Sequence, residues 1–131
     1  MTNPQSLGQI GEDKAAEYLK KEGYKILKRN WKSGKPEIDI IAENNDFIVF
    51  VEVKTRSDDY LEHPRSAINR DKQRSIIFAA DNYIRWNNVD KESRFDVITV
   101  IKKGDEYEID HIENAFYPTP VSYTHLRAHE T

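Results

Sequence analysis

The chain has 131 residues, of which 20 are Lys or Arg and 23 are Asp or Glu, so its formal net charge at pH 7 is −3. This length predicts one domain that can bury a core without stabilisation by disulfides or bound metal ions. The absence of cysteine excludes disulfides and thiolate zinc sites. No apolar run approaches the roughly 18 residues of a membrane span, so we expect a soluble cytoplasmic protein with no membrane partner.

Apolar residues at helical spacing predict two helices, over residues 7–22 and from about 65 to 86. Runs of β-branched and aromatic residues predict five strands, over residues 24–30, 37–43, 47–55, 95–101 and 106–112. The order is therefore α-β-β-β-α-β-β, in a single α/β domain that spans residues 1–120. Residues 121–131 have no periodicity that continues this pattern, and we interpret them as a non-native or disordered tail.

Two neighbouring predicted strands carry charged side chains inside apolar runs. Strand alternation puts Glu52 and Lys54 on one face with Ile48 and Phe50. If the strands pair as a hairpin, Asp39 lies within a few ångströms of Glu52. Such a pair of carboxylates needs a compensating cation. The alternative is a buried salt bridge with Lys54, which would balance only one acid.

The first predicted helix places another acid, Glu12, on or beside its apolar stripe. Gly8 and Gly11 would let this helix approach a sheet closely, at a cost in helix propensity. Glu12 would then point inward and join the acidic cluster. The alternative is that Glu12 is a first-turn acid that complements the helix dipole.

Basic and acidic residues are segregated along the chain. Residues 20–35 contain seven basic side chains and one acid, whereas residues 37–62 contain eight acids and two basic side chains. An acidic centre beside a basic flank would suit a metal site next to a track for phosphates. For the basic run alone, a solvated face is the favoured explanation.

Three motifs together carry a resemblance to a known family. They are the Gly-x-x-Gly-Glu segment ending at Glu12, Glu37-Ile38-Asp39-Ile40-Ile41, and Val49-Phe50-Val51-Glu52-Val53-Lys54-Thr55-Arg56. With Arg94-Phe95-Asp96-Val97-Ile98, they resemble the YraN-type family of small bacterial predicted endonucleases. That family belongs to the PD-(D/E)xK nuclease superfamily. Over residues 6–117 the resemblance implies a restriction endonuclease-like core, with a central mixed sheet of about five strands flanked by helices.

The resemblance also implies a divalent-metal-dependent endonuclease that hydrolyses phosphodiester bonds in DNA. Asp39, Glu52, the Val53 carbonyl and Glu12 would bind Mg²⁺ or Mn²⁺, because hard oxygen ligands suit these ions. Asp39, Glu52, Lys54 and Glu12 would be the catalytic residues. Lys54 would position or deprotonate the attacking water and offset charge at phosphorus.

Further candidates for nucleic-acid contact lie on either side of the predicted loop. Lys72 and Gln73 would contact phosphate or metal-bound water if their helix begins near the site. Thr55 and Arg56 would contact the nucleic-acid backbone, with solvated loop residues as the equal alternative. The lack of a base-reading module favours branched or damaged DNA as substrate, and a homodimer would suit a cut of both strands. Two other functions stay open, namely a catalytically weak nucleic-acid-binding module that acts with a partner and a structural protein whose acids bind metal for stability.

Overall fold

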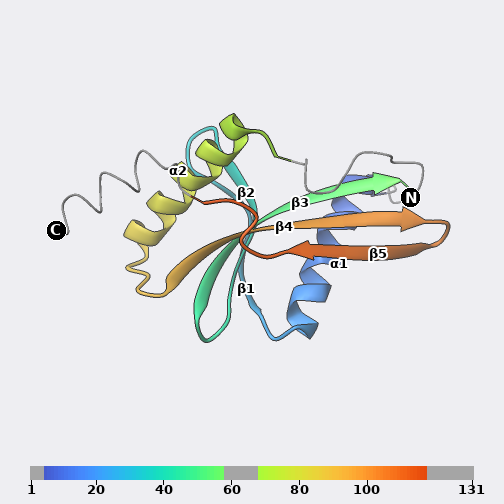
Figure 1. The fold of residues 1–131 in the computed structure, drawn as a ribbon, viewed down its shortest axis with the longest axis horizontal. Coiled ribbons are helices and arrows are strands. Elements are labelled where there is room, and N and C mark those ends of the chain that lie inside the picture. The colour runs from blue at the N-terminus through green and yellow to red at the C-terminus, as the bar shows by residue number, and fades with distance from the viewer. Residues whose placement is uncertain (1–4, 58–67, 118–131) are drawn as a thin grey trace.

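The computed structural model describes residues 5–57 and 68–117, which form a five-stranded sheet and two helices (Figure 1). The elements follow the chain order α1 (Leu7–Lys21), β1 (Lys25–Lys32), β2 (Glu37–Glu43), β3 (Phe47–Ser57), α2 (Arg70–Trp86), β4 (Glu92–Lys103) and β5 (Glu106–Ile112). The predicted order α-β-β-β-α-β-β is confirmed. The sheet order is β1-β2-β3-β4-β5, so β3 is the central strand and β1 and β5 are the edges.

The sheet is mixed, as expected. β1 pairs with β2, β2 with β3 and β4 with β5 in antiparallel ladders, whereas β3 and β4 run parallel. A parallel pair needs a crossover connection, and α2 lies in that connection. This arrangement is consistent with an α/β restriction endonuclease-like core.

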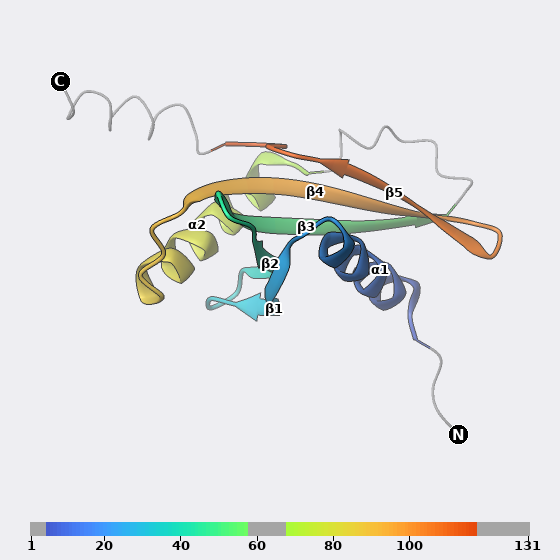
Figure 2. The ribbon, with the colours of Figure 1, turned by 90° about the horizontal axis from the view of Figure 1, so that it is seen from below.

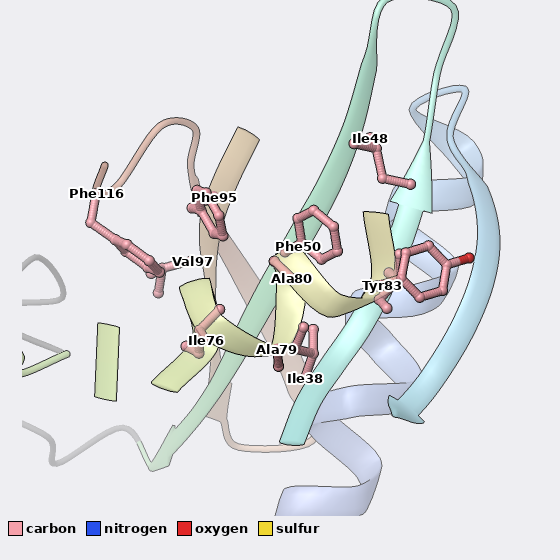
Figure 3. Packing of buried hydrophobic residues seen from close by; sticks show 11 residues of the cluster. Ile38, Ile48, Phe50, Ile76, Ala79, Ala80, Tyr83, Phe95, Val97 and Phe116 are labelled. Carbon is pink, nitrogen blue, oxygen red and sulfur yellow. The ribbon is translucent and has the colours of Figure 1, made fainter. Parts of the chain in front are cut away.

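The two helices pack against opposite faces of the sheet, because alternate residues of β3 enter two different clusters. Ile48 and Phe50 join a cluster with Ile76 and Tyr83 of α2, which Figure 3 shows from close by. Val49 and Val51 join the cluster that contains Leu19 and the alanines of α1. Figure 2 shows α1 and α2 near opposite ends of the long strands β3 and β4. The predicted alternation of β3 is therefore confirmed.

Several predicted boundaries were wrong, each for a local reason. α2 begins at Arg70 rather than near residue 65, because Asn69 is extended and its side chain accepts a hydrogen bond from the Lys72 amide. β4 begins at Glu92 rather than Phe95, because its parallel ladder with β3 starts at the pair Phe47 and Glu92. Residues 65–67 and the tail 121–131 lie outside the described residues, so the tail and the 1–120 domain boundary stay predictions.

Only one of the two glycines singled out in α1 has the expected packing role. A Cβ on Gly11 would lie 2.0 Å from Thr55 Oγ1 of β3, so Gly11 permits close contact between α1 and the sheet. A Cβ on Gly8 would meet nothing within 4 Å, so the expectation for Gly8 was wrong. Gly11 therefore fixes how closely α1 approaches the end of β3.

A buried polar cluster joins β4, β5 and α1. Asp96 is fully buried in the middle of β4, where Arg94 Nη2 donates to its Oδ2 at 2.8 Å and His111 Nε2 lies 2.7 Å from the same oxygen. Tyr18 OH of α1 lies 2.9 Å from His111 Nδ1. Burial alone would raise the pKa of Asp96, but the hydrogen bonds from His111 and Arg94 hold it below its usual value. Asp96 is therefore the buried salt-bridge partner of Arg94.

No helix in the described ranges 5–57 and 68–117 is long and apolar enough to cross a membrane.

Candidate active site

The β2–β3 hairpin places Asp39 and Glu52 together. Its register pairs Ile40 with Val51, so the next position along the ladder sets Asp39 opposite Glu52. Asp39 Oδ2 accepts a hydrogen bond from the Val53 amide at 2.8 Å, which fixes its carboxylate beside β3. The Asp39 carboxylate lies close enough to Glu52 to raise the pKa of Glu52. The two acids that the sequence singled out therefore lie opposite each other on β2 and β3, at the end of their ladder away from the turn.

Glu52 has an unusual electrostatic environment for a carboxyl group. Its side chain is 9% exposed, and its Oε1 is buried with no hydrogen-bond partner in the part of the chain that the structure describes. Burial and, to a lesser extent, the nearby Asp39 carboxylate raise the pKa of Glu52, Lys72 and Lys54 act in the opposite direction, and the net result is a pKa of about 7. Lys72 Nζ lies 3.7 Å from Glu52 Oε2. The negative charge is thus only partly compensated.

An open cavity of about 640 Å³ lies beside these acids. It is lined by the start of α1, by β1 and β2, and by residues 52–56 of β3. Lys54 is half-buried in this lining, two positions beyond Glu52. Within residues 5–57 and 68–117, Lys54 makes no ion pair. The alternative of a salt bridge between Lys54 and one of the two acids was therefore wrong. The Lys54 ammonium is therefore available to a group that enters the cavity.

Glu12 lines the same cavity but has its own partners. Its Oε1 accepts hydrogen bonds from Arg29 Nη2 at 3.1 Å and from Asn30 Nδ2 at 2.8 Å, both from β1. Asn30 has a φ of 52°, a left-handed conformation that Asn tolerates better than most residues. The dipole alternative for Glu12 was wrong, because the first turn of α1 contains no acid.

The nucleic-acid candidates are divided between the cavity and the rest of the molecule. Thr55 and Arg56 line the cavity and belong to β3 itself, so the solvated-loop alternative was wrong for them. Lys72 reaches Glu52 from the first turn of α2. Gln73 instead donates from Nε2 to the Ile68 carbonyl at 3.1 Å, and it does not line the cavity. The structure thus brings three of these four residues to the acids.

The donor set at this point fits a hard divalent cation. The two paired carboxyl groups supply oxygen, Val53 lines the same cavity, and the buried, unpartnered Glu52 Oε1 is the kind of atom that a cation would satisfy. Across the described ranges, no three Asp, Glu or His side chains are close enough to hold a metal ion. Glu12 therefore stands apart from the pair, and a cation here would keep several water ligands.

Sequence reasoning missed the two residues of β1 that hold Glu12. Arg29 also contacts Asp13 at 2.7 Å, so it joins two acids of α1 to the sheet. The basic run over residues 20–35 indicated that a basic residue could contact the acids, but charge alone did not show which of its seven basic residues would do so. The left-handed backbone at Asn30 has no signature beyond the residue type.

Fold and site together define a small α/β protein whose mixed sheet carries paired carboxyl groups and a lysine at one open cavity. Comparison of sequences then identifies the family. The model of the uncharacterised protein family UPF0102 matches residues 11–100, and the chain belongs to this family. A UPF0102 protein of Parabacteroides distasonis is 47% identical over 117 residues, which cover 89% of this chain and 97% of that protein.

Relatives in other bacteria match over a similar length. A UPF0102 protein of Bacteroides fragilis is 46% identical over 112 residues, covering 86% of this chain and 93% of its own. One of Syntrophotalea carbinolica is 45% identical over 112 residues, covering 85% and 91%. These names describe no activity, so the function has to be argued from the site.

Proposed function

We propose that this protein is a divalent-metal-dependent nuclease of the PD-(D/E)xK superfamily that hydrolyses phosphodiester bonds in DNA. The observation that carries this proposal is the position of Asp39 opposite Glu52 in the β2–β3 hairpin, with the buried Glu52 Oε1 lacking a partner in the described chain. A purely structural carboxyl pair would be expected to satisfy that oxygen, because a buried polar atom without a partner is costly.

Each residue has a distinct proposed role. Asp39, Glu52 and the Val53 carbonyl would hold Mg²⁺ or Mn²⁺, which would supply electrostatic stabilisation of charge on the phosphate. Lys54 would orient the attacking water and offset negative charge as it develops at phosphorus. The Val53 amide keeps the Asp39 carboxylate oriented through its 2.8 Å hydrogen bond. Thr55 and Arg56 line the same cavity and would contact the nucleic-acid backbone.

Cleavage assays would test the proposal directly. Purified protein would be incubated with labelled single-stranded, duplex and four-way-junction DNA, and with RNA, in Mg²⁺ or Mn²⁺. We expect Glu52→Gln and Lys54→Ala each to lower the rate by about a hundredfold or more, with junction DNA cut best. Lys20→Ala is the matched control, because Lys20 is exposed near the end of α1 and outside the cavity. Equal cleavage by all variants would identify a contaminant and refute the proposal.

A second candidate is a nucleic-acid-binding module with weak turnover. One observation favours it: Glu12 is bound by Arg29 and Asn30 instead of joining the other acids. This function predicts salt-sensitive binding of DNA that survives Glu52→Gln, without metal-dependent cleavage by the wild type. The expected homodimer and cytoplasmic location belong to both proposals, and light scattering of the purified protein with and without junction DNA would test the former.

A further inference from the structure

The two oxygens of Glu52 have different surroundings. Oε1 is buried and has no hydrogen-bond partner within the described residues, whereas Oε2 faces the Lys72 ammonium at 3.7 Å. A bound divalent cation and an ammonium group at this carboxylate would repel each other, because both carry positive charge at close range. The Lys72 ammonium therefore supplies part of the positive charge that a metal ion would supply to Glu52 in the proposed site.

Lys72 combines a fixed backbone with a movable side chain. Its amide donates to Asn69 Oδ1 at 2.9 Å, which anchors it in the first turn of α2. Its side chain is 47% exposed, so the ammonium can leave Glu52 without crossing the core. The lysine stem is flexible and its ammonium binds phosphate as a point charge. Lys54, by contrast, lies half-buried within β3.

We propose that Lys72 is an exchangeable counter-ion of Glu52, so that binding of a divalent metal and binding of a phosphate group strengthen each other. Without ligands, the ammonium occupies Glu52 Oε2 and opposes metal binding. A phosphate group that enters the cavity attracts the ammonium, and Glu52 then becomes a better metal ligand. This inference rests on the proposed metal site and adds a regulatory role for a residue that a nuclease mechanism does not itself require.

Thermodynamic linkage requires that phosphate changes the affinity for the metal by the same factor as the metal changes the affinity for phosphate, so a binding measurement with either ligand reveals the coupling. Because Lys72 is half exposed, solvent screens its effect, and the expected change in metal affinity is a modest one of about fivefold. Removal of the charge should tighten metal binding in the absence of phosphate. It should also weaken the ability of phosphate to promote metal binding.

Titration calorimetry with Mn²⁺ alone, at pH 8 and low salt, tests the first consequence. We expect Lys72→Gln to bind Mn²⁺ about fivefold more tightly than the wild type. Lys72→Arg keeps the charge and should bind as the wild type does. Arg74→Gln is the matched control, because Arg74 is exposed on the same helix and pairs with Asp71 instead of Glu52. Equal or weaker binding by Lys72→Gln, with its far-ultraviolet circular dichroism unchanged, would overturn the inference.

A second titration with saturating thymidine 5′-monophosphate tests the coupling itself. The nucleotide should tighten Mn²⁺ binding to the wild type by a larger factor than to Lys72→Gln, and equal factors would overturn the inference. Glu52→Gln separates the two proposals. If Mn²⁺ binds the wild type and Glu52→Gln abolishes binding, a null result for Lys72 refutes this inference alone. If the wild type binds no Mn²⁺, the proposed metal site itself is refuted.

Discussion

Replacing Glu52 by Gln should stabilise the protein in a pH-dependent way. The folded-state pKa of Glu52 is about 7, against an ordinary value of 4.5, because burial and the Asp39 carboxylate disfavour its charged form. The folded state therefore binds a proton more tightly than the unfolded state. The resulting stabilisation is fully present below about pH 4.5 and is lost as the pH rises through 7.

The structure sets the size of this effect. The difference between 4.5 and 7 corresponds to about 3 kcal/mol of unfolding free energy. Gln never ionises, so it avoids this cost at every pH. We expect Glu52→Gln to be more stable than the metal-free wild type by about 3 kcal/mol at pH 8 and by less than about 1 kcal/mol at pH 5.

Urea unfolding, followed by the fluorescence of Trp31 and Trp86, measures both free energies in the presence of a chelator. Glu17→Gln is the control, since Glu17 is exposed on α1 and its replacement should change stability little at either pH. Mg²⁺ should stabilise the wild type at pH 8 and leave Glu52→Gln unchanged, because a ligand stabilises only the state that binds it. A Glu52→Gln variant that is destabilised to the same extent at pH 5 and pH 8 would refute the electrostatic reasoning.

Three further predictions concern packing and backbone conformation. Gly11→Ala should cost about 2 kcal/mol in thermal or urea unfolding, because the new Cβ would overlap Thr55 Oγ1, and Thr55→Ala in the same chain should recover part of the loss. Asp96→Asn should cost about 3 to 5 kcal/mol, since it removes the buried carboxylate that pairs with Arg94 and leaves only the exposed Glu113 carboxylate at 3.6 Å; a loss under 1 kcal/mol would contradict this role. Asn30→Ala should cost about 1 kcal/mol because Ala is strained at a φ of 52°, whereas Asn30→Gly should keep most of the stability, and equal losses in calorimetry would argue against backbone strain.

The sequence was sufficient to place the paired acids because the evidence for them is local. The alternation of β3 fixes the face of Glu52, and a short turn brings Asp39 back along the neighbouring strand. Element order followed from the same periodicity. The part of the site within the β2–β3 hairpin was therefore predictable from residues 37–55 alone.

The remaining contacts depend on how distant elements pack. Arg29 meets Glu12 only because β1 lies beside α1, and nothing in the basic run marks that one arginine. Lys72 reaches Glu52 only because the crossover brings the first turn of α2 close to β3. Asp96 contacts His111 only because β5 pairs with β4 in the register that the structure shows, and these two residues are 15 positions apart in the chain. Such contacts have no signature in local spacing.

The positions of the two sheet edges limit how copies of this chain can associate. β1 exposes Lys25, Lys28 and Lys32 along one edge, and β5 exposes Glu106 and Glu108 along the other. A two-fold dimer that continued the sheet through either strand would set like charges against each other. Charged edges of this kind also keep unpaired backbone groups from recruiting another strand. Like charges on each edge therefore oppose a symmetric dimer that continues the five-stranded sheet.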